Sequence, residues 1–200
     1  MKTVFFDVDT QLDFISPAGA LYVPGAEEIV GSLEDLTRFA DKNRVQIIST
    51  VDAHTENDPE FQIWKPHCVA GTQGQQKLSE TLLGAPLVVD SRPGSLEAVS
   101  SQVASARQIV VEKRQLDVFS NGNLHSLLEL INAERYVVYG LVTEYCVRSA
   151  AFGLLERKAR VELVVDAVKS LGADDERVTL ERFQAQGGRL VTVGDVLQQT

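Results

Sequence analysis

Short runs of apolar and β-branched residues recur along the chain, and longer segments with a helical period of apolar residues separate them. This alternation is typical of α/β proteins built on a parallel sheet. The sequence predicts six strands, over Thr3–Val8, Val45–Val51, Gln108–Glu112, Tyr136–Leu141, Val161–Val165 and Arg189–Val193. The run Leu87–Asp90 is a candidate for a further short strand. The predicted helices cover Ala26–Asn43, Asn123–Ala133, Thr143–Lys158 and Asp174–Gln186.

Composition narrows the class of protein. The 200 residues, of which 44% are hydrophobic and 24% charged, fit one globular domain over 1–200 and exclude disordered and fibrous classes. The formal net charge of −9 disfavours nucleic acid and anionic membranes as partners. Asp7 and Asp9 interrupt the apolar start before a signal-peptide core forms, and no stretch approaches the roughly 18 apolar residues of a membrane span. Two cysteines are too few for a disulfide scaffold, so we expect a cytoplasmic protein.

One long segment, from Asp52 to about Gly74, has no clean period and contains scattered proline and glycine residues. A loop of this length inside a compact domain is usually functional. It contains two of the three histidines of the chain. The residues of chemical interest in this segment are Asp52, His54, Glu60, Trp64, His67 and Cys68.

The predicted strand ends carry reactive side chains. In an open parallel sheet, the carboxyl ends of the strands share one edge, where ligands bind. Asp9, Asp52-Ala53-His54 and Lys113 each follow a predicted strand, and a fourth strand runs into the turn before Cys146. Each has an ordinary alternative role when it is taken alone, because aspartate often caps a turn and lysine often ends a strand in solvent. Together they indicate a site at this edge.

Cys146 is the most specific of these signals. The chain passes there from strand to helix, with Thr143 suited to the N-cap and Cys146 at the third helical position. The helix N-terminus would stabilise a thiolate, and its amides could hold an oxyanion. The alternative is a small buried hydrophobe, because cysteine is among the most buried residue types. Cys68 lacks the strand-to-helix setting, and we expect it to be structural.

A thiol nucleophile needs a base that accepts its proton and returns it to the leaving group. His54 and His67 lie in the irregular segment and His125 begins a helix, so none of them follows a strand as a base for Cys146. A carboxylate must then serve, and Asp9 is the leading candidate. Lys113 would favour the charged forms of both the thiol and the carboxylate.

These residues stand within motifs that resemble the isochorismatase-like cysteine hydrolases, and among them the nicotinamidases (pyrazinamidases). The resemblance spans nearly the whole chain, and motifs that are weak singly are strong in this order and spacing. It implies a three-layer α/β/α fold with a mainly parallel six-stranded sheet, isochorismatase-like (Rossmann-like). The motifs are Asp9-Thr10-Gln11-Leu12-Asp13-Phe14, Asp52-Ala53-His54, Pro66-His67-Cys68-Val69-Ala70-Gly71-Thr72, Lys113 and Gly140-Leu141-Val142-Thr143-Glu144-Tyr145-Cys146-Val147.

The resemblance implies a catalytic triad of Asp9, Lys113 and Cys146. It also implies that the amides of Val142 and Cys146 form the oxyanion hole, with a cis peptide between Leu141 and Val142. True isochorismatases resemble this chain but carry at the nucleophile position a residue that cannot attack. Cys146 therefore indicates covalent amide hydrolysis, and the likeness to nicotinamidases implies a place in NAD salvage.

Nicotinamidases bind a divalent metal through an Asp-x-His pair and a later His. Asp52, His54 and His67 match this pattern, and Glu60 is the expected fourth ligand by its spacing. The mixed nitrogen and oxygen set suits one Zn, Fe or Mn ion. The alternative is two solvated loop histidines, and the Pro66-His67 motif favours the metal.

The resemblance also implies that two aromatic residues, Phe14 and Trp64, flank the ring of the substrate. Each has a structural alternative, core packing for Phe14 and a loop anchor for Trp64, because aromatic side chains mostly bury apolar area.

The sequence departs from the nicotinamidase pattern after Lys113. Nicotinamidases usually continue with Gly and a Tyr-Ser-aromatic stretch, whereas this chain continues with Arg114-Gln115-Leu116-Asp117-Val118-Phe119-Ser120. The segment Leu82–Ser105 carries no family motif. A related hydrolase of another small amide or carbamoyl compound is therefore the second hypothesis. A non-catalytic binding module is the third, and the intact triad argues against it. We expect a small-molecule amide as partner, and a homo-oligomer is compatible with the sequence.

Overall fold

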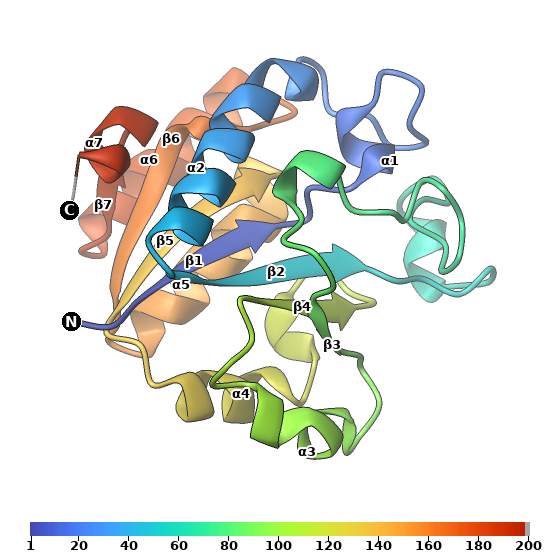
Figure 1. The fold of residues 1–200 in the computed structure, drawn as a ribbon. Helices are drawn as coiled ribbons and strands as arrows, with labels where there is room; N and C mark the ends of the chain where they lie inside the picture. Colours follow the sequence, from blue (N-terminus) through green and yellow to red (C-terminus); the bar gives the residue numbers. More distant parts are fainter. Residues whose placement is uncertain (199–200) are drawn as a thin grey trace.

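A computed structural model describes residues 1–198, which form a seven-stranded parallel sheet in the order β3-β4-β2-β1-β5-β6-β7 (Figure 1). The strands are β1 (Thr3–Val8), β2 (Gln46–Asp52), β3 (Leu87–Val89), β4 (Gln108–Lys113), β5 (Arg135–Leu141), β6 (Arg160–Lys169) and β7 (Arg189–Val191). The parallel α/β class is confirmed, but the strand number of six is wrong. The additional strand is β3, whose run of three residues pairs only with β4 at the sheet edge and gives little periodic signal.

Residues 1–198 contain the four predicted helices close to their predicted positions and three further short helices, each of four or five residues, that the sequence pattern did not predict. The helices are α1 (Leu12–Ile15), α2 (Val30–Lys42), α3 (Ser95–Val99), α4 (Leu124–Ile131), α5 (Arg148–Glu156), α6 (Ala173–Ala185) and α7 (Val193–Leu197). Two predicted helices are each divided into two parts. A 3₁₀ turn over Ala26–Ile29 precedes α2, and a π-helical turn over Thr143–Val147 precedes α5. Each of these two turns lies at the start of its helix, where the chain comes from the carboxyl edge of the sheet.

Two apolar cores, one on each face of the sheet, hold the layers together. In β1, Val4, Phe6 and Val8 join the core that includes residues of α3, α4, α5 and α6, whereas Phe5 joins the core with α2 and α7. Figure 1 shows α2 in front of the sheet and α5 behind it. Strands buried on both faces need apolar residues at nearly every position, which explains the unbroken hydrophobic runs of the sequence.

The irregular segment after β2 covers the carboxyl edge of the sheet. Figure 1 shows the arrowheads of β1 and β2 pointing toward this segment and α1. One isolated bridge within the segment pairs His54 with Val69, and another just after it pairs Lys77 with Gln11, three residues beyond the end of β1. A 3₁₀ turn, Pro59–Gln62, is the only helical element of residues 53–74. The predicted irregular loop is therefore confirmed, and it forms one wall of the site.

Among residues 1–198, no helix has both the length and the apolar character needed to cross a membrane.

Candidate active site

The site lies where the direction of strand order changes. From β1 the chain builds the sheet outward through β2 and β4, and it later returns to place β5 on the other side of β1. Such a switch point opens a crevice at the carboxyl ends of the strands. Asp9 directly follows β1, and Cys146 lies in the π-helical turn after β5. The topology therefore brings together two residues that are far apart in sequence.

Gly140 allows β5 to approach β1 closely just before this turn. Gly140 pairs with Val8 in the sheet and has a φ of +119°, a conformation that side chains disfavour. A Cβ atom at this position would lie 2.1 Å from the carbonyl oxygen of Val8. Only glycine fits, and the close approach sets the position of Cys146 relative to Asp9.

Lys113 lies at the centre of the charged groups. Its Cα pairs directly with that of Asp52 in the β2–β4 ladder, so both side chains reach the crevice from adjacent strands. Lys113 Nζ is 2.5 Å from Asp52 Oδ1, 2.9 Å from Asp9 Oδ2 and 3.7 Å from Cys146 Sγ. Burial acts to lower the pKa of Lys113, but Asp52 and Asp9 outweigh it and raise that pKa well above its ordinary value. These carboxylates therefore favour the charged form of the buried Lys113.

Asp9 has the properties of a base. It is buried, and its Oδ1 accepts a hydrogen bond of 2.6 Å from Thr50 Oγ1. Its backbone has a φ of +50°, and its N–H donates to the carbonyl oxygen of Thr50 on β2. Burial raises the pKa of Asp9 above its ordinary value, while Lys113 and the Thr50 hydroxyl partly offset this rise. A carboxylate with a raised pKa accepts a proton more readily.

Cys146 differs from the prediction in its local geometry and protonation. The N-cap position belongs to Val142, and Thr143 is the first residue of the π-helical turn, its hydroxyl donating to Glu176 Oε1 at 3.2 Å. Burial raises the pKa of the Cys146 thiol well above its ordinary value, and Lys113 only partly offsets this rise. The resting group is a thiol, so attack requires a base. The peptide between Leu141 and Val142 is cis, as the resemblance implied.

Cys68 is buried, and burial raises the pKa of its thiol far above the ordinary value. Its Sγ contacts the carbonyl oxygen of Gly74 at 3.9 Å, inside the loop segment. These contacts agree with the expected structural role.

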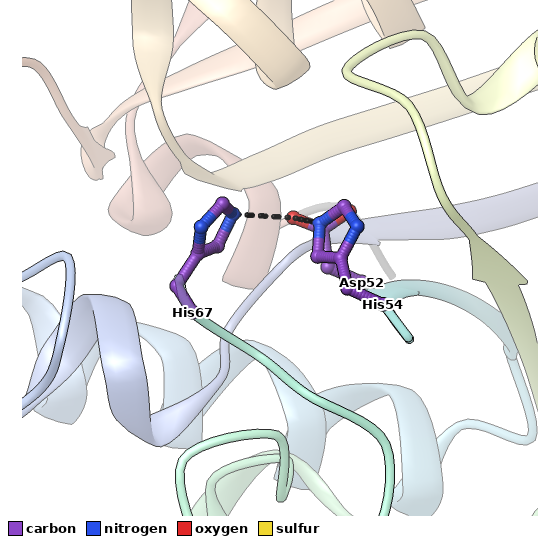
Figure 2. Close-up of side chains that lie close together, drawn as sticks. All are labelled: Asp52, His54 and His67. Carbon is purple, nitrogen blue, oxygen red and sulfur yellow. Dashed lines mark ion pairs between the residues drawn. The ribbon is translucent and has the colours of Figure 1, made fainter. Parts of the chain in front are cut away.

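Asp52, His54 and His67 form a buried cluster next to the triad (Figure 2). Each offers one potential ligand atom, and these atoms lie within 4.8 Å of one another. Asp52 Oδ2 lies 3.9 Å from His54 Nε2 and 3.7 Å from His67 Nε2, whereas Asp52 Oδ1 faces Lys113. The two oxygens of Asp52 thus join the cluster to the triad.

The cluster fits a divalent metal ion. Neither ring nitrogen of the buried His54 makes a hydrogen bond within residues 1–198, although Asp58 Oδ2 lies 3.4 Å from Nδ1 and Asp52 Oδ2 lies 3.9 Å from Nε2. A buried nitrogen of this kind is costly without a ligand. His67 Nδ1 contacts the carbonyl oxygen of Lys65 at 2.7 Å, which leaves Nε2 with the lone pair. Burial lowers the pKa of His54 and keeps the ring neutral, as a metal ligand must be. Glu60 lines the adjoining pocket but is not among the three clustered residues, so its ligand role stays a prediction.

A pocket opens beside Cys146. Phe14 and Trp64 both line it, together with Glu60 and the metal-cluster residues Asp52 and His67. The other lining residues are Leu21, Val23, Leu116, Val142, Tyr145, Cys146 and Leu171. The wall is mostly apolar, as in sites for small molecules. The structure thus brings the two predicted aromatic residues to the same pocket as Cys146, the predicted nucleophile.

Sequence reasoning gave no role to two residues that shape this site. Tyr145 packs edge-to-face against Trp64, with ring centroids 5.3 Å apart. Gln11 connects the ends of β1 and β2, because its side chain accepts from Asp52 N at 2.7 Å and donates to Asp52 O at 2.8 Å. The sequence offered one signal for each of them. Tyr145 directly precedes Cys146, and Gln11 lies two residues after Asp9.

Comparison with known proteins places the chain in a family. The Isochorismatase domain profile matches residues 3–195, and the chain therefore belongs to the isochorismatase family. It is 24% identical to a nicotinamidase of Saccharomyces cerevisiae, over 88% of this chain and 91% of the relative. The structure of the pyrazinamidase of Pyrococcus horikoshii in complex with zinc is 26% identical, with a TM-score of 0.80 over 96% of this chain and 99% of that one. N-carbamoylsarcosine amidase from Thermoplasma acidophilum shares the fold, with a TM-score of 0.76 at 24% identity over 96% and 97% of the two chains.

Proposed function

We propose that the chain is a metal-dependent cysteine amidohydrolase that converts nicotinamide, or a close pyridine carboxamide, to the acid and ammonia. One observation carries the proposal: the buried Lys113 Nζ contacts the Asp9 carboxylate, the Cys146 thiol and a ligand of the histidine cluster at once. An amide-hydrolysing enzyme needs a nucleophile, a base and a compensating charge, and all three meet beside one pocket. The family membership and the nicotinamidase relatives support the same reaction.

The reaction follows from the protonation states of the triad. Asp9 accepts the proton of the Cys146 thiol while the sulfur forms a bond to the carbonyl carbon of the amide. The amides of Val142 and Cys146 are proposed to stabilise the oxyanion. Asp9 then returns the proton to the leaving nitrogen as the C–N bond breaks, which leaves a thioester on Cys146. Asp9 takes a proton from a water molecule while the water oxygen forms a bond to the thioester carbon. The C–S bond then breaks to release the acid, and Asp9 gives its proton to the sulfur, which restores the thiol.

Lys113 supplies charge compensation throughout these steps. Because it remains protonated between two carboxylates, it stabilises the thiolate when the proton moves to Asp9. Asp52, His54 and His67 would hold the divalent ion, which when bound supplies a Lewis acid that orients a pyridine nitrogen. Phe14 and Trp64 are proposed to contact the faces of the ring.

The direct test measures ammonia release from nicotinamide by the purified protein. The wild type is expected to release ammonia and nicotinate in equal amounts, and the variant Cys146→Ala none above background. A folded, metal-loaded wild type that releases no ammonia from nicotinamide or pyrazinamide would contradict the proposed substrate class.

A second candidate is the hydrolysis of another small amide or carbamoyl compound. The lining of the pocket supports this candidate. Leu116 lines the pocket, and it belongs to the segment after Lys113 that departs from the nicotinamidase pattern. The same assay separates the two functions when a panel of aliphatic amides and N-carbamoyl compounds is included. A higher kcat/KM on a carbamoyl compound than on nicotinamide would select the second candidate.

Metal removal is expected to abolish turnover of nicotinamide. Elemental analysis of the purified protein should find one divalent ion per chain, and incubation with a chelator should remove the ion and the activity together. Zinc, iron or manganese added back should restore both, because the ligand set of one carboxylate and two imidazoles suits each of them. A metal-free preparation with full activity would remove the proposed metal dependence.

Trp64→Ala is expected to weaken transition-state binding of nicotinamide by about 1 to 3 kcal/mol, measured as kcat/KM. The reason is the loss of a ring that lines the pocket and packs on Tyr145. A small aliphatic amide should lose less, since it has no ring to contact. Ile63→Ala is the matched control, because this neighbouring residue is 80% exposed. An equal loss on both substrates would instead make Trp64 a loop anchor.

A further inference from the structure

Asp58 lies directly behind His54, on the side of the ring away from Asp52. It is 5% exposed and precedes the 3₁₀ turn Pro59–Gln62. Its Oδ1 accepts a hydrogen bond of 3.2 Å from the N–H of Glu60. Its Oδ2 lies 3.4 Å from His54 Nδ1. One buried carboxylate thus caps the loop turn and faces a proposed metal ligand.

Arg114 holds this carboxylate from another part of the fold. It follows Lys113 at the end of β4, in the segment that departs from the nicotinamidase pattern. Its Nε donates to Asp58 Oδ2 at 3.0 Å, and its terminal nitrogen donates to Thr55 Oγ1 at 3.2 Å. The guanidinium therefore connects the strand that carries the catalytic lysine to the loop that carries the metal cluster.

This arrangement bears on the tautomer of His54. A neutral imidazole has one N–H and one lone pair, and the neighbour of one nitrogen decides where the proton resides. Asp58 Oδ2 lies 3.4 Å from His54 Nδ1, whereas Asp52 Oδ2 lies 3.9 Å from His54 Nε2. A carboxylate acceptor at Nδ1 favours the proton there and leaves the Nε2 lone pair for an ion.

We propose that Asp58 and Arg114 are positioning residues of the metal centre. Asp58 fixes the orientation and tautomer of His54, and Arg114 holds Asp58 in place. The inference rests on the metal site of the proposed function and extends it to two residues outside the cluster. Asp58 faces the cluster residue His54, and Arg114 contacts Asp58. The competing explanation is that Asp58 only caps the turn Pro59–Gln62.

The test is the zinc affinity of metal-free protein, measured by competition with a chromophoric chelator. Asp58→Asn is the informative variant, because asparagine caps a turn as well as aspartate does but places an amide donor near His54. It is expected to bind zinc about 10- to 100-fold more weakly than the wild type. Arg114→Met should weaken binding in the same direction by a smaller factor, and Arg114→Lys should restore part of the loss.

Arg107→Met is the matched control. Arg107 and Arg114 directly precede and follow the same strand, β4, but Arg107 pairs with Asp41 at 3.1 Å on the opposite edge of the sheet. Its replacement should leave zinc affinity unchanged. A loss in Arg107→Met equal to that in Arg114→Met would overturn the inference, because the effect would then be one of general stability.

A second readout reports the tautomer itself. Nitrogen-15 NMR of the imidazoles in the metal-free wild type is expected to show the His54 proton on Nδ1, and Asp58→Asn should move it to Nε2. A capping role alone would not move it. Unchanged tautomer and zinc affinity in Asp58→Asn and Arg114→Met would overturn the inference while the proposed function stands. A wild type that binds no zinc would overturn both the metal site and this inference, whereas zinc binding without amide hydrolysis would overturn only the proposed function.

Discussion

Cys146→Ala is expected to lower kcat on nicotinamide by on the order of 10⁴-fold or more, with the fold intact. The sulfur forms the covalent bond of the proposed reaction, and Lys113 Nζ at 3.7 Å is placed to stabilise its thiolate. Because the side chain lies at the pocket wall, removing one sulfur atom should change thermal stability little. Single-turnover assays and circular dichroism on the same preparation measure both quantities.

Cys68→Ala is the control for this variant. Cys68 is buried and its thiol pKa is raised far above the ordinary value, so it should neither react nor support turnover. A stoichiometric thiol alkylator should modify Cys146 and inactivate the enzyme, and peptide mapping locates the adduct. Inactivation with the adduct on Cys68 and with Cys146 unmodified would contradict the assignment.

Asp9→Asn is expected to lower kcat/KM by on the order of 10³- to 10⁴-fold, because asparagine cannot accept the thiol proton or return it. The amide oxygen can still accept the hydrogen bond that Thr50 gives to Asp9, so the protein should remain folded. Asp90→Asn, which changes a carboxylate paired with Arg92 outside the pocket, should retain activity. Steady-state kinetics with a thermal unfolding curve for each variant is the measurement. Turnover by folded Asp9→Asn near the wild-type rate would remove the base role.

The pH profile identifies Asp9 independently of that variant. Asp9 must be ionised to act as a base, so activity should be present above its pKa and lost as the pH falls through it. Burial raises this pKa, which moves the acidic limb of kcat/KM to a higher pH than an exposed aspartate would give. Thr50→Val removes a hydrogen bond that lowers the pKa of Asp9, so it should move the limb further upward. If the acidic limb of kcat/KM does not move in Thr50→Val, the ionisation that it reports belongs to another group.

The hydrophobic pattern is sufficient to predict most of the fold. Strands such as β1 and β5 are buried on both faces, so their unbroken apolar runs identify them. The pattern gives weak information at the sheet edge, where β3 has only three residues and one neighbour. It also cannot distinguish a π-helical turn from the first turn of an α-helix. The order of apolar and polar residues in Thr143–Val147 is compatible with both. Edge strands and helix starts therefore depend on the packing around them.

The meeting of Asp9, Lys113 and Cys146 could be predicted because each lies at or just after the carboxyl end of a strand. Asp9 directly follows β1, Lys113 is the last residue of β4 and Cys146 lies in the turn after β5. Parallel strands bring their carboxyl ends to one edge whatever the loops do. The protonation of Cys146 could not be predicted in this way. Burial and the neighbouring carboxylates raise the pKa of its thiol more than Lys113 lowers it, and burial is a property of the packed molecule.

The contacts behind the site depend on tertiary structure alone. Arg114 and Asp58 are 56 residues apart, and no periodicity relates them, yet the guanidinium reaches the carboxylate at 3.0 Å. Gln11 joins the backbone of Asp52 across 41 residues. Sequence determined which residues occupy the strand ends, because burial on both faces of a parallel sheet constrains residue type locally. Only the tertiary structure decided which side chains contact and orient these strand-end residues. Strand order and the path of the loop bring such side chains within hydrogen-bond distance.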